Sequence, residues 1–106
     1  MPDYVIALTT CPVDISRKLA RLLVEKQVCA CVNIIPRVMS IYHWKDEIIE
    51  DEESILLMKT EANQKEDLWE TLRKEHPYEV PEFIIIPIIW GSKEYLDWIS
   101  QSITNL

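Results

Sequence analysis

The sequence feature that most constrains the fold is a pair of long extended segments joined by a polar turn. Residues 30–44 are rich in β-branched and aromatic side chains and are long for a single strand, and residues 48–60 return as the next strand. Lys45-Asp46 supplies the turn, because Asp tolerates left-handed backbone geometry. Pro36 predicts a bend or a bulge in the first segment. We therefore expect a long central hairpin.

A strand and an amphipathic helix precede this hairpin. Residues 4–10 are short, apolar and β-rich, which predicts the first strand. Apolar residues then recur at helical spacing from Ile15 to Leu23, with charged residues on the other side. We expect this helix to begin at Asp14 as its N-cap and to end near Gln27.

A second helix, a further strand and a last helix follow the hairpin. Residues 63–66 fit a capping box, and the helix must stop by His76 because Pro77 disfavours helical geometry at the residue before it. Residues 83–89 predict a strand buried on both faces, and Ser92 is expected to cap the final helix. The order β-α-β-β-α-β-α predicts an α+β, ferredoxin-like split β-α-β sandwich with an extra C-terminal helix, in one domain spanning all 106 residues.

Composition excludes several classes of function. Glycine occurs once, so neither of the glycine-rich phosphate loops can be written. The 11 basic and 18 acidic residues give a net charge of −7 with no basic patch, which argues against nucleic acid or an anionic membrane as a partner. The longest apolar run, residues 83–90, is far short of the roughly 20 residues that a membrane helix needs.

The chain start and the cysteines predict a cytoplasmic protein. The first residues lead into an apolar strand without a basic region or a cleavage site. The three cysteines are odd in number, and Cys29 and Cys31 would point the same way on a strand, a geometry that rarely forms a good disulfide. Reduced thiols are the simpler interpretation.

The hairpin predicts self-association. A four-stranded split β-α-β sheet covers one face with its two helices and leaves the other face open. Tyr42, Trp44 and Ile48 belong on that open side or its rim, where a lone subunit would expose an apolar patch of roughly several hundred Å². Closed cyclic assembly would cover this surface, so these three residues are the predicted subunit interface.

Six of the eight residues from 46 to 53 are acidic. They have no room for a core, so residues 50–53 should be solvated or lie at an assembly edge. Such a cluster could form a site for a hard cation. A charged hairpin that resists edge-to-edge pairing is the favoured alternative.

Five blocks of the chain resemble the CutA divalent-cation tolerance family, in order and at the family's spacing. They are residues 30–36 (ACVNIIP), 40–44 (SIYHW), 57–60 (LMKT), 76–82 (HPYEVPE) and 95–99 (YLDWI). The resemblance implies a ferredoxin-like fold, a tight homotrimer similar in architecture to the PII signalling proteins, and a link to tolerance of copper and other divalent cations. Some bacterial relatives carry a thiol and paired histidines where this chain has Thr9, Glu75 and His76.

Given that resemblance, imidazole and thiolate groups are the natural copper ligands. His76, Cys11 and Cys31 are the candidates, with Glu79 or Glu82 adding a carboxylate. His76 is otherwise a helix C-cap, and Cys31 a buried structural thiol. Cys11 is expected in a loop, exposed and available to metal. The predicted ligand is copper or another divalent metal, with no organic cofactor.

A second group consists of Lys59, His76, Tyr78 and Glu82. Two prolines make the loop that carries the last three rigid, and a rigid loop presenting imidazole, phenol and carboxylate suits a ligand pocket. The alternative is that these prolines only shape the entry to the fourth strand. Both interpretations are kept.

Two functional hypotheses follow, and neither is an enzyme. Cys11 or Cys31 with His76 is the only conceivable nucleophile and base, and no glycine near either cysteine is available for a tight oxyanion turn. The first hypothesis is a homotrimer that binds or responds to divalent metal ions. The second is a PII-like signalling or scaffold module that binds a small anion or a partner protein in the clefts between subunits.

Overall fold

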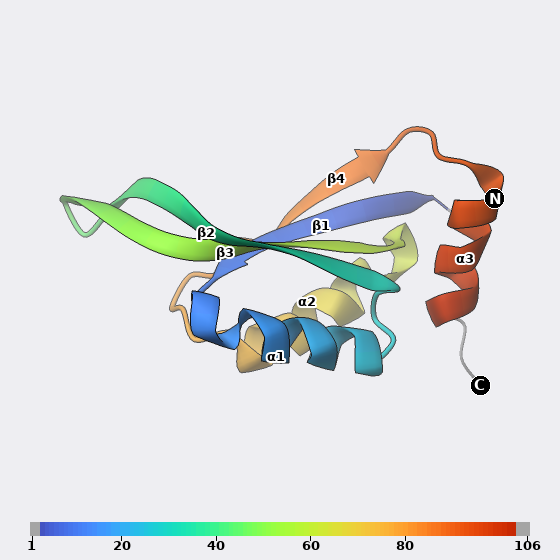
Figure 1. Cartoon of the computed structure of the whole chain (residues 1–106), viewed down its shortest axis with the longest axis horizontal. Coiled ribbons are helices and arrows are strands. Elements are labelled where there is room, and N and C mark those ends of the chain that lie inside the picture. Colours follow the sequence, from blue (N-terminus) through green and yellow to red (C-terminus); the bar gives the residue numbers. More distant parts are fainter. Residues whose placement is uncertain (1–2, 104–106) are drawn as a thin grey trace.

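The computed structural model describes residues 3–103, which form one antiparallel sheet and a set of helices (Figure 1). The strands are β1 (Tyr4–Cys11), β2 (Cys31–Trp44), β3 (Glu47–Glu61) and β4 (Ile84–Ile88). The α-helices are α1 (Val13–Glu25), α2 (Lys65–Glu75) and α3 (Lys93–Ile103), and a short 3-10 helix, η1 (Ala62–Gln64), precedes α2. The predicted element order is confirmed, with η1 as the one addition among the described residues.

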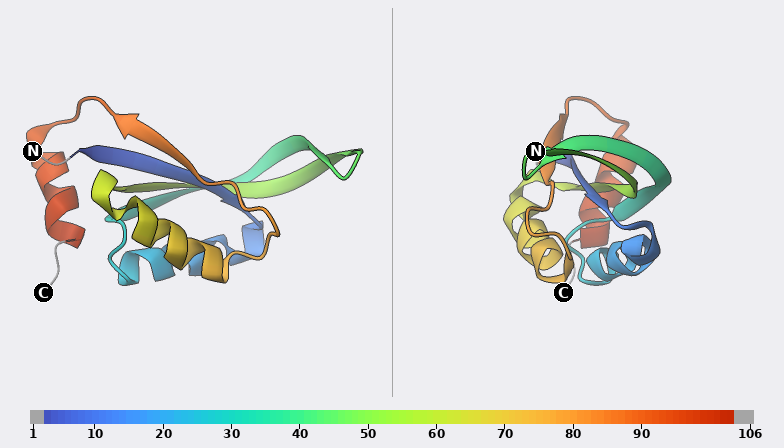
Figure 2. Two further views of the ribbon diagram at one scale, coloured as in Figure 1. Left: turned by 180° about the vertical axis from the view of Figure 1, so that it is seen from behind. Right: turned by 90° about the vertical axis from the view of Figure 1, so that its left-hand side faces the viewer.

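The sheet has the order β2-β3-β1-β4, and each pair of neighbours is antiparallel. Helices α1 and α2 lie side by side against one face, as both views of Figure 2 show. Helix α3 lies across one end of the sheet (Figure 1). This arrangement confirms the predicted α+β, ferredoxin-like fold.

The core lies between the sheet and the pair of helices. Ala7, Leu56 and Met58 from β1 and β3 are fully buried there, and so are Leu23 of α1 and Leu68 of α2. These strand residues alternate with side chains that point to the opposite face, as a pleated strand requires. Burial of such side chains stabilises the fold by about 25 cal/mol per Å² of apolar surface.

The β2–β3 hairpin projects well beyond the rest of the sheet (Figure 1), which gives the molecule its longest dimension of 45 Å. Lys45 and Asp46 form the turn with φ angles of 50° and 67°, so both residues adopt left-handed geometry as a two-residue hairpin turn requires. The register shifts between Ile35 and Val38, and Arg37 has a φ of 61°. The predicted turn and the predicted bulge beside Pro36 are therefore confirmed.

Two of the predicted helix starts differ from the structure. Pro12 holds the N-cap position of α1, and Asp14 lies inside the first turn, where its charge still suits the helix dipole. The capping box predicted at residues 63–66 does not form, because η1 takes up part of that segment and no side-chain bond caps α2 in the described chain. Ser92 caps α3 as predicted, since its Oγ accepts the backbone N–H of Tyr95 at 3.3 Å.

The prediction that the last strand is buried on both faces is wrong for this chain. β4 is an edge strand with β1 as its neighbour, and its residue Ile85 packs against the core under α1 and α2 while Ile88 packs against the cluster at α3. Ile84 and Ile86 point the other way from Ile85 and are 47% and 42% exposed. Pro87, which cannot donate a ladder hydrogen bond, is compatible with an edge position.

Helix α3 covers one end of the face that α1 and α2 leave open. Ile99 and Ile103 pack there against Tyr4 and Ala30. The Tyr4 hydroxyl lies 2.6 Å from Ser100 Oγ, and the Ser100 hydroxyl also bonds Glu61. The remainder of this face is called the open face below.

Candidate functional site

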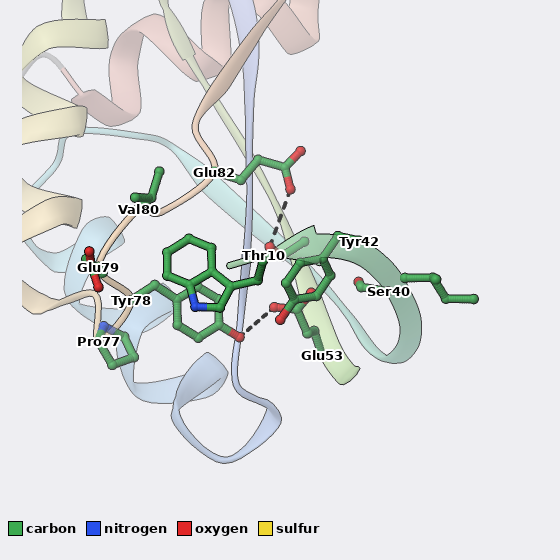
Figure 3. A pocket seen from close by; sticks show the side chains of 11 residues that line it. Thr10, Ser40, Tyr42, Glu53, Pro77, Tyr78, Glu79, Val80 and Glu82 are labelled. Atoms are coloured by element: carbon green, nitrogen blue, oxygen red, sulfur yellow. Dashed lines mark hydrogen bonds between the residues drawn. The ribbon is translucent and has the colours of Figure 1, made fainter. Parts of the chain in front are cut away.

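A cavity of about 780 Å³ lies between the β2–β3 hairpin and the segment that joins α2 to β4 (Figure 3). The hairpin contributes Tyr42 and Trp44 from β2 and Glu53 from β3. Thr10 of β1 and residues of the segment 77–82 complete the wall. Ligand pockets in proteins commonly have volumes of roughly 300–1,000 Å³, so the cavity is large enough for a small organic molecule.

His76 fixes this segment to the sheet. It occupies the C-cap position of α2, with an extended backbone, and its side chain is buried. Its Nδ1 accepts the backbone N–H of Tyr78 at 3.2 Å, so the ring proton resides on Nε2, which donates to the Thr10 carbonyl at 2.7 Å. Both ring nitrogens are therefore engaged within the chain, and the predicted end of α2 before His76 is confirmed.

Glu53 is a buried carboxylate in the cavity wall. It is 4% exposed, and its Oε2 accepts a hydrogen bond from the Tyr78 hydroxyl at 2.5 Å (Figure 3). Burial raises the pKa of Tyr78, and the hydrogen bond to Glu53 and its charge raise that pKa further. Tyr78 therefore remains a neutral donor at physiological pH. Of the two alternatives predicted for residues 50–53, the solvated one is wrong at Glu53, because Tyr78 of the segment 77–82 packs against it.

Glu82 is held at the cavity by two neighbouring threonines of β1. Thr9 Oγ1 donates to the Glu82 carbonyl at 2.6 Å, and Thr10 Oγ1 donates to its carboxylate at 3.4 Å. On the hairpin, the Tyr42 hydroxyl donates to Asp51 at 2.8 Å, which raises the pKa of Tyr42. Hydrogen bonds thus orient side chains on both sides of the cavity.

The charges that line the cavity all have one sign. Glu53, Glu79 and Glu82 are lining residues, and none of the lining residues in the described chain is basic. The nearest cation to this group is Lys45, whose Nζ lies 4.0 Å from Glu79 Oε1 with both side chains 71% exposed. Such an exposed pair is screened by water and neutralises the cavity little.

The four predicted metal ligands are not gathered by this chain. Cys11 is the last residue of β1 and is fully buried, so the expectation of an exposed loop thiol is wrong. Burial, with the charges of Glu53 and Asp14, raises the pKa of the Cys11 thiol to about 11, so it is protonated at neutral pH. Within residues 3–103, no three His, Cys, Asp or Glu side chains form a group that could hold a metal ion.

The other candidates occupy separate places. Cys31 lies on the open face, half-buried, with its thiol 3.9 Å from the Asn33 side chain. Lys59 bonds the same Asn33 oxygen and is not among the residues that line the cavity. The structure therefore brings Tyr78, Glu79 and Glu82 together and leaves Cys31 and Lys59 elsewhere.

Glu53 and Thr10 are cavity residues that sequence reasoning missed. Glu53 belongs to a run of four acidic residues, and no local pattern separates it from the three exposed ones before it. Thr10 ends a run predicted only as a strand. Because their role depends on a segment about 25 to 70 residues away along the chain, only the tertiary fold reveals it.

A ferredoxin-like sheet with a protruding hairpin and a cavity at one side of that hairpin defines a small α+β protein with a split β-α-β sheet. The family model described as CutA1 divalent ion tolerance protein matches residues 5–102. The chain therefore belongs to the CutA1 family.

Relatives from distant organisms agree with this assignment. A divalent-cation tolerance protein CutA from Thermus thermophilus is 42% identical over 94% of this chain and 97% of its own length. Protein CutA from mouse is 44% identical over 90% of this chain, which spans 54% of the mouse protein. The solved apo structure described as a PII-like protein CutA from Nostoc is 40% identical, with a TM-score of 0.88 over 92% of this chain and 95% of that one.

Proposed function

We propose that this chain works as a homotrimer in divalent-cation tolerance and that it is not an enzyme. The family is described as divalent ion tolerance proteins. The observation that carries the proposed assembly is the open face of the sheet. Of the helices in residues 3–103, none is long and apolar enough to cross a membrane. We place the protein in the cytoplasm because all three cysteines in the described chain are free.

The open face carries apolar residues from all four strands of the described sheet. Leu8 of β1 pairs with Leu57 of β3 on one side and with Ile84 of β4 on the other, and all three alternate with core residues. Ile86 continues this row, and Ile35 of β2 is 42% exposed. Contiguous apolar surfaces of this kind are rare on monomers and mark protein interfaces.

The hairpin also exposes apolar side chains, beyond the body of the sheet. Ile41 and Ile48 are 64% and 59% exposed near its tip. A ring of three chains would let each hairpin lie against the next subunit while the open faces meet, which covers both surfaces at once. Of the predicted interface residues, Ile48 fits this role best, because Tyr42 and Trp44 also line the cavity of their own chain.

Sedimentation equilibrium tests the assembly. We expect wild type to sediment as three 12.5-kDa chains at micromolar concentration. Ile86→Lys places a charge on the open face and should shift the protein toward monomer. Val24→Lys is the matched control, because Val24 is 39% exposed on α1, away from the open face. A well-folded monomeric wild type would refute the trimer.

Growth of cells tests the physiological role. A bacterial host that lacks its own member of the family is challenged with copper while it expresses wild type or Ile86→Lys. We expect wild type to restore growth and the assembly-defective variant to restore less. Equal growth without the protein would contradict a role in tolerance.

The residues predicted as copper ligands do not fit a preformed site in one chain. His76 uses both nitrogens, and Cys11 is a buried neutral thiol, which leaves Cys31 and Glu79 accessible. We therefore propose that copper binds to the trimer through Cys31, which lies on the face that assembly brings together. Anaerobic copper titration should show weaker binding for Cys31→Ser and unchanged binding for His76→Ala. The reverse result would favour the single-chain ligand set.

The cavity favours a second role, a PII-like module that binds a small molecule. The predicted class of ligand was a small anion or a partner protein. Three carboxylates and no basic group among the lining residues of the described chain disfavour an anion. Thermal melts with nucleotides and small carboxylates should therefore show no stabilisation, because a ligand raises the melting temperature only when it binds the native state.

A further inference from the structure

We propose that the cavity beside the hairpin binds a small organic cation, a protonated amine that carries an apolar body. The inference rests on the second role above, ligand binding by a PII-like module, and is independent of copper. Three features of the cavity support it: its charge, an acceptor left without a donor, and its aromatic walls.

The charge of the lining selects the sign of the ligand. Glu53, Glu79 and Glu82 contribute negative charge, and the cavity walls in residues 3–103 contribute no Lys, Arg or His. Concave surfaces lined by one sign of charge focus the electrostatic field and raise the local concentration of counter-ions. A phosphate or carboxylate ligand would meet three like charges, and Lys45, the cation beside the cavity, already pairs with Glu79.

Glu53 supplies a buried acceptor for that ligand. Its Oε2 accepts a hydrogen bond from the Tyr78 hydroxyl, whereas its Oε1 has no side-chain donor among the described residues and is not enclosed, so it stays open to the cavity. A hydrogen bond from an ionised donor to a carboxylate is about twice as strong as a bond between neutral groups. An ammonium N–H entering the cavity would complete the coordination of Glu53.

The walls suit an organic cation with an apolar body. Tyr42, Trp44 and Tyr78 line the cavity beside Ile41 and Val80. Aromatic faces attract cations within roughly 6 Å of the ring centroid, and Trp does so most strongly. The ring of Trp44 already has a cation near it, because Lys45 Nζ lies 5.5 Å from its centroid.

A bare metal ion fits these features less well. Metal ions in proteins are held by several donors at short distances. No group of three His, Cys, Asp or Glu side chains that could do so occurs in the described part of the chain. A volume of about 780 Å³ is also far larger than a single ion requires. An amine with an apolar body uses the carboxylate, the rings and the volume together.

Calorimetric titration of the assembled protein tests the proposal with three probes that share one body. They are 2-phenylethylammonium, neutral 2-phenylethanol and anionic 3-phenylpropionate. We expect the cation to bind about tenfold or more tightly than the alcohol, and the anion to show no binding. Equal affinity for cation and alcohol, preference for the anion, or no binding of the cation would overturn the proposal.

Variants locate the binding site. Glu53→Gln removes the buried charge with little change in shape and should weaken binding of 2-phenylethylammonium about tenfold. Glu50→Gln is the matched control, because it makes the same change on an exposed part of the same strand. Trp44→Leu tests the aromatic wall at a partly exposed position and should weaken binding about fivefold. Unchanged affinity in Glu53→Gln and Trp44→Leu would refute the assigned site.

Sedimentation of the same samples separates this inference from the proposed function. Trimers that fail to bind the amine would refute the ligand class and leave the assembly intact. A monomeric protein that binds the amine through Glu53 would support the cavity and refute the trimer.

Discussion

The hydrogen bond between Tyr78 and Glu53 should stabilise the fold measurably, and Tyr78→Phe removes it alone. The bond is 2.5 Å long and supplies the single protein donor to a carboxylate that is 4% exposed within the described chain. Hydrogen bonds to charged groups contribute about 1.5–3 kcal/mol, and a carboxylate left without its donor retains its desolvation cost. Because Tyr78 is itself only partly buried, the lower half of that range applies, and we expect a loss of about 2 kcal/mol in the free energy of unfolding.

Urea unfolding at neutral pH measures this loss. All variants are compared at one protein concentration, because the stability of an oligomer depends on it. Tyr95→Phe is the matched control. It removes the same hydroxyl from an exposed tyrosine whose ring packs against Trp98 but whose hydroxyl makes no hydrogen bond within the described residues, so it should change stability by less than about 0.5 kcal/mol.

A double-mutant cycle isolates the interaction. In a Glu53→Gln background the buried charge is gone, so Tyr78→Phe should cost at least about 1 kcal/mol less than in wild type. If Tyr78→Phe matches Tyr95→Phe, or if its cost is the same in both backgrounds, the hydrogen bond does not stabilise the segment over the cavity as argued.

Two further predictions concern the hairpin turn and the buried thiols. Asp46→Gly should raise the free energy of unfolding by about 0.5 kcal/mol, because Asp46 has a φ of 67° that glycine adopts without strain. Urea unfolding measures this change. A decrease would show that the Asp46 side chain stabilises the turn. Burial raises the pKa of Cys29 from about 9 to about 12, so the folded state keeps a proton that the unfolded state loses. The contribution of the neutral Cys29 thiol to the free energy of unfolding is therefore fully present below pH 9 and is lost as the pH rises toward 12. Urea unfolding between these pH values should show a smaller fall in stability for Cys29→Ala than for wild type. An unchanged slope of stability against pH would contradict this assignment.

Features that depend on neighbouring residues were predictable from the sequence. The Lys45-Asp46 turn, the bulge beside Pro36 and the stop of α2 before Pro77 all follow from backbone restrictions that act within a few residues. The element order follows from hydrophobic periodicity for the same reason.

Features that depend on packing were not predictable. Cys11 is predicted as a loop residue because Pro12 and Asp14 punctuate the strand, yet β1 continues through it opposite Ser54 of β3. Ile84 and Ile86 looked like core residues, but β4 is an edge strand and their side of the sheet is the open face. The local sequence shows whether a side chain is apolar or polar. Whether that side chain is buried depends on residues that are distant along the chain and pack over it.

The bulge explains how one hairpin serves both the sheet and the cavity. Before it, Ile34 of β2 pairs with Leu56, so even-numbered residues of β2 face the helices; after it, Val38 pairs with Glu53, so even-numbered residues share the face of Glu53. Because side chains alternate along a strand, the extra residue in β2 reverses the orientation of everything beyond it. Without the bulge, Tyr42 and Trp44 would point away from Glu53, and the cavity would lose two of its three aromatic lining residues. The proline that interrupts the strand therefore lies at the position of the bulge that turns Tyr42 and Trp44 toward the cavity.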